Sequence, residues 1–170
     1  VVRHFAPVEA FAPERWDEAL AVNLSAPFHL IRLALPAMKQ RGWGRIINMA
    51  SIYSTRAVAD RIDYVTTKTA ILGLTRAVAI ETATTGITCN AISPGTLPTP
   101  AIQGKIASIA AHEGRSVDET TRDYLAAQIP FPRRLGKPPE FAALACHIVE
   151  NPMLNGETIR LDGAIRMQPK

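Results

Sequence analysis

The stretch Arg45-Ile46-Ile47-Asn48-Met49-Ala50, followed directly by Ser51, decides the fold class of this chain. The stretch is short and apolar on both faces, which is typical of a parallel strand that helices cover on both sides. A polar loop over residues 51–62 comes next, so the strand should end at residue 50. We therefore predict a buried parallel strand over 45–50, with Ser51 at its carboxyl end.

Helical and extended patterns alternate along the rest of the chain. The elements that these patterns predict are, in order, helix 14–41 ending at Gly42, strand 45–50, helix 63–85 ending at Gly86, strand 87–93, a weaker helical pattern over 101–129, helix 139–150 and strand 157–161. Such alternation indicates βαβ units and a parallel sheet. The predicted fold is α/β, a Rossmann-like doubly wound parallel sheet, in a single domain over residues 1–170.

The composition fits a globular domain and argues against several other classes of protein. Of the 170 residues, 47% are hydrophobic and 20% are charged. The net charge of +4 is dispersed apart from Arg133, Arg134 and Lys137, which favours a solvated basic surface over a nucleic-acid site. The chain has no uninterrupted run of about 18 apolar residues. It also has no secretory leader pattern, so neither a membrane span nor a membrane partner is expected.

The His and Cys residues do not indicate a metal centre or a disulfide framework. No pair of the four His has metal-ligand spacing, so no metal site is predicted. Cys89 and Cys146 lie in apolar segments without CxxC spacing, which favours buried free thiols over a disulfide. Free thiols are typical of a reducing compartment, and a cytoplasmic location is expected.

Tyr64 and Lys68 are candidate catalytic residues, because they share one face of the helix predicted over 63–85. An ammonium beside a phenol favours the phenolate, which suits a general acid/base. A Tyr–Lys pair at this spacing is more often simply solvated. The assignment therefore depends on where the pair lies relative to the sheet.

Three strand ends converge with the start of that helix. Ser51, Pro94-Gly95 and Asp162-Gly163 directly follow the three predicted strands. Ligands of open α/β sheets bind outside the carboxyl ends of the strands. Ser51 alone would be interpreted as a loop cap, but its place at this rim makes it a candidate catalytic residue.

Asn23 lies inside the first predicted helix, where Asn is not favoured. Pro27 stands four residues later and has no N–H, so the Asn23 carbonyl loses its helical hydrogen bond and the helix should bend. A freed carbonyl that points inward can hold a water molecule. Pro36 frees the Arg32 carbonyl in the same way, so the proline alone is not diagnostic.

In chain order these residues resemble the short-chain dehydrogenase/reductase family. The pattern consists of Asn23, Asn48-Met49-Ala50-Ser51, Tyr64-Val65-Thr66-Thr67-Lys68 and Asn90-Ala91-Ile92-Ser93-Pro94-Gly95. Ser51 precedes Tyr64 by 13 residues and Tyr64 precedes Lys68 by four, spacings similar to those of the family. YxxxK alone is a weak signal, but the ordered set is specific. The resemblance runs from about Val2 to Gly163.

The resemblance implies a nicotinamide cofactor, NAD or NADP with NAD favoured, and a role for each residue. Tyr64 would exchange a proton with the substrate oxygen while hydride moves to or from the nicotinamide. Lys68 would favour the ionised phenol and bind the nicotinamide ribose, and Ser51 would position the substrate oxygen. The Asn23 carbonyl would anchor a water that links Lys68 to solvent. The implied cofactor-binding residues are Tyr64, Lys68, Pro94, Gly95, Leu97 and Thr99.

Several family features have no counterpart in this sequence. The family opens with a strand and a glycine-rich TGxxxGxG turn whose N–H groups hold the pyrophosphate. A residue that selects NAD or NADP and an NNAG motif follow, and the family's DGG is Asp162-Gly163-Ala164 here. The expected sheet thus lacks its N-terminal strands and glycine-rich loop, which leaves strand 45–50 as an unprotected apolar edge. We expect residues 1–170 to be inactive alone.

Within the family, residues 41–48 and the long segment 101–134 are similar to the D-3-hydroxybutyrate dehydrogenases. The positions that contact substrate in those enzymes differ, which implies another small 3-hydroxy or 3-oxo acid. The candidate substrate-binding residues are Arg3, Ser51, Tyr53, Arg61 and Lys105, and their cations favour a carboxylate. A homotetramer is implied for the intact enzyme. Two alternatives stay open: a 3-oxoacyl-carrier-protein reductase, which usually has a shorter lid, and an inactive remnant that acts through subunit association.

Overall fold

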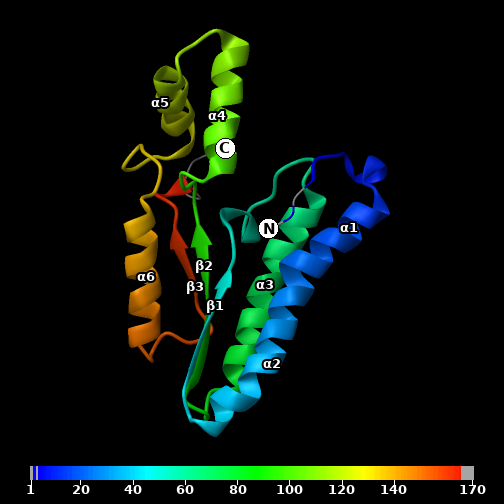
Figure 1. Cartoon of the computed structure of the whole chain (residues 1–170), viewed down its shortest axis with the longest axis vertical. Helices are drawn as coiled ribbons and strands as arrows, with labels where there is room; N and C mark the ends of the chain where they lie inside the picture. Colours follow the sequence, from blue (N-terminus) through cyan, green and yellow to red (C-terminus); the bar gives the residue numbers. More distant parts are fainter. Residues whose placement is uncertain (1, 3, 166–170) are drawn as a thin grey trace.

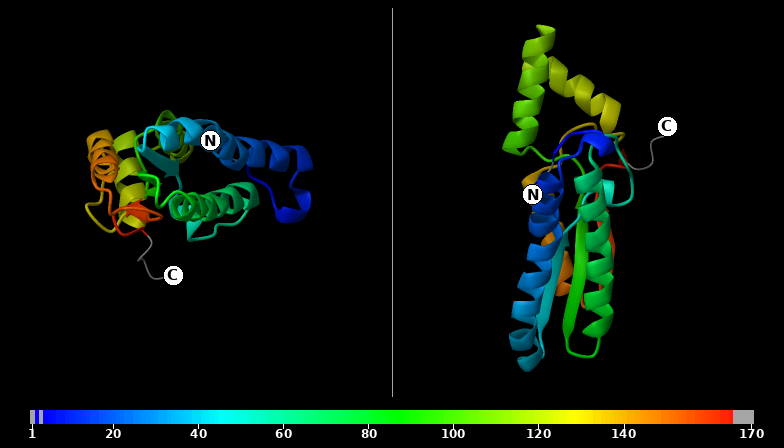
Figure 2. Two further views of the ribbon diagram at one scale, coloured as in Figure 1. Left: turned by 90° about the horizontal axis from the view of Figure 1, so that it is seen from below. Right: turned by 90° about the vertical axis from the view of Figure 1, so that its right-hand side faces the viewer.

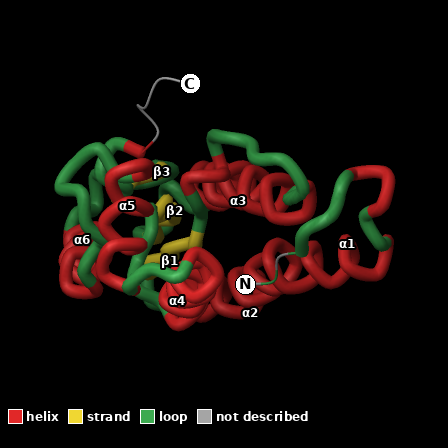
Figure 3. The backbone as a smooth tube through the Cα atoms, turned by 90° about the horizontal axis from the view of Figure 1, so that it is seen from above, coloured by secondary structure: helices red, strands yellow, loops and turns green. Residues whose placement is uncertain are grey.

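Helices cover both faces of a three-stranded sheet in the computed structural model, which describes Val2 and residues 4–165 (Figure 1). The elements are α1 (Pro13–Leu20), α2 (Ala26–Gln40), β1 (Gly44–Met49), α3 (Ile62–Glu81), β2 (Ile87–Pro94), α4 (Pro100–Glu113), α5 (Val117–Gln128), α6 (Pro138–Glu150) and β3 (Thr158–Leu161). α2 and α3 lie on one face of the sheet, and α6 lies on the other (Figures 1 and 3). The predicted α/β fold is confirmed.

The strands pair in the order β1-β2-β3, and both pairs are parallel. β1 aligns with β2 from Gly44 opposite Ile87 to Met49 opposite Ile92. β2 is buried almost throughout, as expected for a parallel strand that helices cover on both faces. Within the described residues β1 has a neighbouring strand on one side only, so its other edge is open.

The main core lies between the sheet and the two long helices that run along the strands (Figure 2). Ile46 of β1 and Ile87 of β2 pack there against Ile31 of α2 and Val78 of α3. Full burial of such a side chain stabilises the fold by about 1.5–3 kcal/mol. On the opposite face, α6 buries Ile148.

The predicted helix 14–41 is one helical path whose middle is wider than an α-helix. Residues Ala21–Ser25, between α1 and α2, have π-helical geometry, and the Ala26 N–H donates to the Ala21 carbonyl five residues back. Pro27 explains the irregularity, because it offers no N–H to the Asn23 carbonyl. The sequence predicted a bend at Asn23, and the structure has a π segment at that place.

The same helical path, Pro13–Gln40, is long enough and apolar enough to cross a bilayer by length and composition. This finding corrects the expectation, drawn from the absence of a long uninterrupted apolar run, that no segment meets that criterion. In the fold, Asn23 and Ile31 of this path are buried, and Ile31 packs against the sheet. Core helices of α/β proteins pass the same test of length and composition.

α3 ends at Glu81, four residues before the predicted end at residue 85. Thr82 Oγ1 donates to the Val78 carbonyl at 2.8 Å, and the Thr85 N–H donates to the Thr82 carbonyl at 2.9 Å. Threonine hydroxyls that bond the local backbone compete with continuation of a helix. The end of α3 could not be predicted from the periodicity of apolar residues, because that periodicity does not reflect the hydrogen bonds of threonine hydroxyls.

The helical pattern over 101–129 forms two helices, α4 and α5, instead of one. Gly114 adopts a left-handed conformation, with φ at 64°, and ends α4. The Arg115 N–H then donates to the Ala110 carbonyl at 2.9 Å. The two helices form a pair that projects beyond the carboxyl ends of the strands (Figures 1 and 2).

The amino ends of β1 and β2 are adjoined by two glycines, Gly42 and Gly86, with φ values of 66° and 73°. A Cβ at Gly86 would lie 2.1 Å from the Gly42 carbonyl oxygen. Glycine is therefore required at residue 86 both for conformation and for space. From the sequence, Gly42 and Gly86 were predicted only to end helices. The contact between the two glycines was not predicted.

Both cysteines are free, but they differ in exposure. Cys89 lies in the core, and burial raises the pKa of its thiol to about 12. Cys146 is exposed, which corrects the expectation that both thiols are buried. Its apolar neighbourhood in the sequence belongs to α6, which buries Ile148 and leaves Cys146 toward solvent.

Candidate active site

The carboxyl ends of the three strands meet at one rim, together with the first turn of α3 (Figure 1). Ser93 Oγ donates to the Ser51 carbonyl at 2.5 Å, which joins the ends of β1 and β2. The Gly95 N–H donates to the Leu161 carbonyl at 2.9 Å, which joins β2 to β3. The structure thus brings together the strand ends that the sequence placed at this rim.

Tyr64 and Lys68 lie next to each other on α3, where Tyr64 is half-buried and Lys68 is 3% exposed. The Lys68 nitrogen is 5.8 Å from the centre of the Tyr64 ring and donates to the Met49 carbonyl at 2.6 Å. Burial lowers the pKa of Lys68, because the ammonium loses solvation inside the protein. The pair offers a phenol proton beside a buried amine, as general acid/base chemistry requires.

Ser51 begins a short 3-10 turn, Ile52–Ser54, directly after β1. Its Oγ accepts from the Tyr53 N–H at 3.2 Å, and its own N–H donates to Ser54 Oγ at 3.0 Å. These bonds fix the Ser51 hydroxyl at the rim. Because the oxygen accepts, the hydroxyl proton is available to donate to another oxygen. The cap that Ser51 provides is compatible with a role in positioning a substrate.

Asn23 is buried in the π segment, and its side chain holds Val2. Oδ1 accepts from the Val2 N–H at 3.1 Å, and Nδ2 donates to the Val2 carbonyl at 2.7 Å. Nδ2 also lies 3.3 Å from Thr67 Oγ1 on α3. The sequence predicted a role only for the backbone carbonyl of Asn23, and the two bonds of its side chain to Val2 are an additional role. Arg3, a predicted substrate-binding residue, lies outside the described residues.

Asp63 is a site residue that the sequence analysis missed. It is fully buried directly before Tyr64, and its Oδ1 accepts from the Tyr64 N–H at 2.6 Å. Its Oδ2 accepts from the His4 N–H at 3.0 Å, which fastens the segment before α1 to the start of α3. An acidic residue in the first turn of a helix is stabilised by the helix dipole. The place of Asp63 in the first turn of a helix could have drawn attention to it from the sequence. An acidic residue at such a place, however, marks the start of a helix more often than a functional site.

Arg61 and Tyr53 lie beside Tyr64. The Arg61 guanidinium carbon is 4.6 Å from the centre of the Tyr64 ring, 4.7 Å from that of Phe5 and 5.7 Å from that of Tyr53. The rings of Tyr53 and Tyr64 meet edge to face at 6.2 Å. Cations over aromatic faces are attracted by the ring quadrupole. The structure therefore groups two predicted substrate-binding residues around the predicted proton donor.

Lys105 contacts a different part of the chain. It is exposed on α4, and its ammonium lies 5.3 Å from the centre of the Tyr124 ring in α5. The turn between α4 and α5 creates this contact, and periodicity over 101–129 did not indicate that turn. Binding of substrate by Lys105 stays a prediction.

The loop after β2 contains the remaining predicted cofactor residues. Pro94 ends β2, and Leu97 comes within 3.5 Å of the position that a Cβ on Gly136 would occupy. Thr99 precedes α4, and its Oγ1 accepts from the Ile102 N–H at 3.4 Å. These contacts order the loop between the rim and α4. Cofactor binding by Pro94, Gly95, Leu97 and Thr99 stays a prediction.

The groups at the rim fit one end of a nicotinamide dinucleotide. Lys68 and Tyr64 supply an ammonium and a phenol, which suit sugar hydroxyls and a reacting oxygen. A pyrophosphate is usually held by a glycine-rich turn at a helix N-terminus, and this sequence contains no TGxxxGxG. The described residues therefore fit the nicotinamide end, and not the pyrophosphate.

Comparison of the sequence with known proteins shows which family it is similar to. The family model described as enoyl-(acyl carrier protein) reductase matches residues 2–165. D-beta-hydroxybutyrate dehydrogenase of Cupriavidus necator is 44% identical over 144 residues, which are 85% of this chain and 55% of that protein. Human 3-hydroxyacyl-CoA dehydrogenase type-2 is 40% identical over 162 residues, 92% of this chain and 58% of that protein. This chain thus spans little more than half the length of these relatives.

Solved structures share the fold. A gluconate 5-dehydrogenase from Burkholderia cenocepacia, in complex with NADP and tartrate, superposes with a TM-score of 0.85 at 28% identity, over 99% of this chain and 62% of that one. The TT0495 protein of Thermus thermophilus gives a TM-score of 0.83 at 29% identity, over 99% of this chain and 67% of that one. Given the match over residues 2–165, this chain belongs to the short-chain dehydrogenase/reductase family.

Proposed function

We propose that this chain forms the catalytic part of an enzyme that interconverts a secondary alcohol and a ketone with NAD or NADP, on a small 3-hydroxy or 3-oxo acid. The observation that carries the proposal is the Tyr64–Lys68 pair at the rim beside Ser51. The names of the relatives, a hydroxybutyrate and a hydroxyacyl-CoA dehydrogenase, support the reaction class. NAD is proposed over NADP, as the resemblance of the sequence to the family implies.

Each residue of the site has a distinct task in the proposed reaction. A bound nicotinamide supplies the hydride transfer. The Tyr64 hydroxyl gives a proton to a ketone oxygen or takes one from an alcohol, and the nearby Lys68 ammonium favours the ionised phenol. Lys68 also binds the ribose hydroxyls. The Ser51 hydroxyl donates to the substrate oxygen and fixes its distance from Tyr64.

Arg61 supports an acidic substrate. Its guanidinium lies over the Tyr64 ring, beside the proposed proton donor. A guanidinium binds a carboxylate through two parallel hydrogen bonds, which fixes orientation as well as charge. A carboxylate held there would keep the carbinol carbon of a short 3-hydroxy acid close to Tyr64. Arg3 and Lys105 are proposed to act on the same or a second acidic group.

The test uses a fusion that adds the part of the Cupriavidus necator relative with no counterpart here to the amino end of this chain. We expect the fusion to oxidise several 3-hydroxy acids, with the highest kcat/KM for one other than 3-hydroxybutyrate. The reason is that, by the resemblance, Arg61 and Tyr53 stand at positions where the similar enzymes carry other residues. Steady-state kinetics over a panel of 3-hydroxy acids and their uncharged esters measures this preference.

Arg61→Met and Arg61→Lys serve as paired controls for the panel. We expect Arg61→Met to reduce the preference for acid over ester by about 10-fold or more, and Arg61→Lys to restore part of it. A panel in which 3-hydroxybutyrate has the highest kcat/KM would refute the substrate proposal. Absence of turnover on every secondary alcohol would refute the reaction and favour the inactive remnant.

The carrier-protein reductase is the weaker alternative, because α4 and α5 place a long helical pair beyond the rim. We further propose a cytoplasmic homotetramer for the intact enzyme. Exposed apolar side chains on α2 and α3 support association, since Leu33 is 66% and Ile80 is 78% exposed. Cross-linking and size-exclusion chromatography of the fusion would test the oligomeric state.

The stability of the fusion tests a strained turn at the rim. Ala164 has a φ of 65°, a conformation that costs an L-residue about 1–2 kcal/mol, and the family has glycine there. We expect Ala164→Gly to raise the free energy of unfolding by about 0.5–1 kcal/mol, because the freedom of glycine in the unfolded chain offsets part of the gain. Denaturant titration measures it. Ala107→Gly, in the exposed middle of α4, is the control and should lower stability by about 1 kcal/mol; a loss at Ala164 would contradict the strain.

A further inference from the structure

The segment before α1 is fastened to the residues around the start of α3 by two of its backbone N–H groups. The His4 N–H donates to Asp63 Oδ2 at 3.0 Å, and the Ala6 N–H donates to the Asp60 carbonyl at 3.2 Å. The two donors belong to the residues on either side of Phe5. The backbone that carries the Phe5 ring is therefore fixed before and after that residue.

The two acceptors of these bonds stand on either side of Arg61. Asp60 comes directly before Arg61, and Asp63 follows two residues after it. The same pair of bonds thus brings the Phe5 ring to Arg61, whose guanidinium carbon lies over the ring at 4.7 Å from its centre. A cation in this place is attracted by the quadrupole of the ring.

Asn23 holds the same segment two residues earlier. Its side chain accepts from the Val2 N–H at 3.1 Å and donates to the Val2 carbonyl at 2.7 Å. The backbone is therefore held at every second residue, at Val2, His4 and Ala6. Such fastening orders the segment before any ligand binds, and preorganisation of this kind reduces the entropic cost of binding.

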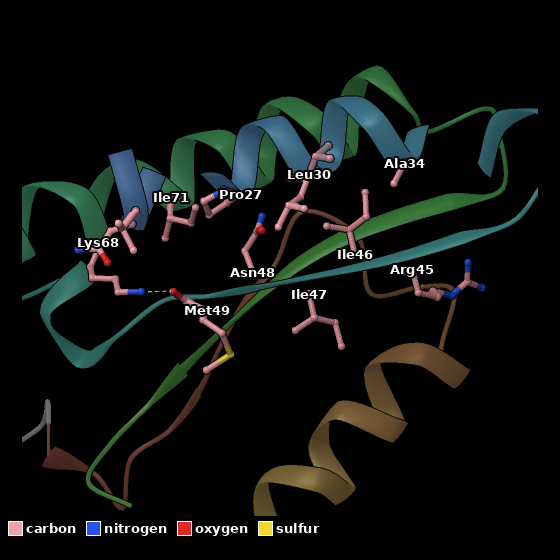
Figure 4. Close-up of a pocket in the computed structure, with 13 residues that line it drawn as sticks. Pro27, Leu30, Ala34, Arg45, Ile46, Ile47, Asn48, Met49, Lys68 and Ile71 are labelled. Atoms are coloured by element: carbon pink, nitrogen blue, oxygen red, sulfur yellow. Dashed lines mark hydrogen bonds between the residues drawn. The ribbon is translucent and has the colours of Figure 1, made fainter. Parts of the chain in front are cut away.

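The Arg61 guanidinium also lies over the ring of Tyr64, with its carbon 4.6 Å from the ring centre. The nitrogen of Lys68 is farther from the same centre, at 5.8 Å. Lys68 is turned toward the Met49 carbonyl, to which it donates at 2.6 Å (Figure 4). Of these two cations Arg61 is the closer to the Tyr64 ring, so its position decides where an acidic group can bind beside the phenol.

The orientation of Arg61 matters because the residue is only 8% exposed. An ion pair is stronger at such a site than in open water, since the effective dielectric constant is lower. A carboxylate uses that strength fully only when it meets the guanidinium through two parallel hydrogen bonds. An arginine side chain has many rotamers, and a ring that packs against the guanidinium restricts them.

We propose that Phe5 is a positioning residue, which holds the Arg61 guanidinium over the Tyr64 ring and thereby sets the preference of the site for acidic substrates. This inference rests on the proposed function, in which Arg61 binds the substrate carboxylate. Phe5 acts through Arg61 and needs no contact with the substrate. A leucine at residue 5 would still cover Arg61, but it would not attract the guanidinium, because the attraction comes from the aromatic ring.

The experiment compares variants of the fusion on the preferred 3-hydroxy acid and on its uncharged ester. Phe5→Leu should lower the preference for acid over ester by about 3- to 10-fold, through a higher KM for the acid and little change in kcat. Phe5→Tyr keeps an aromatic ring and should retain the preference within a factor of about 2. Because the Phe5 side chain is 70% exposed, both substitutions should leave folding intact.

Arg61→Met shows whether Phe5 acts through Arg61. In the Arg61→Met background Phe5→Leu should leave the preference unchanged, because no guanidinium remains to be positioned. Phe28→Leu is the matched control, since it replaces another exposed phenylalanine, on α2 beside His29, and should also leave the preference unchanged. A loss that persists in the Arg61→Met background, or an equal loss in Phe5→Leu and Phe5→Tyr, would overturn the inference.

Denaturant titration of the same fusion measures the contact without any turnover. Phe5→Leu and Arg61→Met together should lower the midpoint of unfolding by less than the sum of their separate effects. Additive effects would overturn the inference whether or not the fusion is active. An inactive fusion with coupled effects would refute the proposed reaction alone. An active fusion whose preference responds to Arg61→Met but not to Phe5→Leu would refute this inference alone.

Discussion

Tyr64→Phe in the fusion should remove nearly all dehydrogenase turnover and leave the affinity for NAD(H) close to unchanged. The phenol supplies the proton at the substrate oxygen, and a positioned acid/base typically contributes about 10²–10⁴-fold. The ring itself packs against Tyr53 and below the Arg61 guanidinium, and those contacts need no hydroxyl. The loss should therefore fall on kcat, with little effect on folding or on cofactor binding.

Steady-state kinetics and fluorescence titration with NADH measure the two parts of this prediction. Tyr124→Phe is the matched control, because it removes a phenol from α5, beside Lys105. Its turnover should stay within a factor of about 3, because the substitution keeps the packed ring and Tyr124 is not assigned a part in proton transfer. A Tyr64→Phe enzyme that keeps turnover within about 10-fold of the parent would contradict the assignment of Tyr64 as proton donor.

Residues 1–170 expressed alone should bind NAD(H) and NADP(H) negligibly, show no dehydrogenase activity, and aggregate or stay partly unfolded. The pyrophosphate has no glycine-rich turn to hold it, and Lys68 is engaged with the Met49 carbonyl. The open edge of β1 is apolar, and such edges pair with other chains.

Calorimetric titration with each cofactor and size-exclusion chromatography test this expectation. Ile47→Lys provides a control, because a charge on an edge strand suppresses aggregation without adding a phosphate site. We expect that variant to be more soluble and still unable to bind either cofactor. A discrete soluble species that binds NAD(H) or NADP(H) at micromolar Kd would show that the chain is self-sufficient.

The sheet could be predicted from the sequence because its signals are local. Strand 45–50 is marked by an apolar run that ends at a polar loop, and the structure places β1 at Gly44–Met49. Ser51 and Tyr64 follow from the positions of the strand end and the helix start. The order and spacing of Ser51 and Tyr64 can be taken from the sequence without knowledge of any tertiary contact.

Long-range side-chain contacts could not be predicted in the same way. The bonds of Asp63 with His4 and of Asn23 with Val2 span 59 and 21 residues, and nothing in the local pattern pairs these residues. The contact of Lys105 with Tyr124 depends on the turn at Gly114. Periodicity reports which face of an element is apolar. It does not report which other element a polar side chain meets.

The contact of Gly42 with Gly86 has a consequence at the opposite end of the sheet. β1 and β2 start their ladder directly after these glycines, with Gly44 opposite Ile87. A slip of one residue would turn every side chain of a strand to the other face. At about 3.3 Å per residue, Gly86 lies about 23 Å from Ser93 at the rim. The register that brings Ser93 Oγ to the Ser51 carbonyl, a contact that joins the two strand ends at the site, is therefore set at the far end of the strands by two residues that have no side chain.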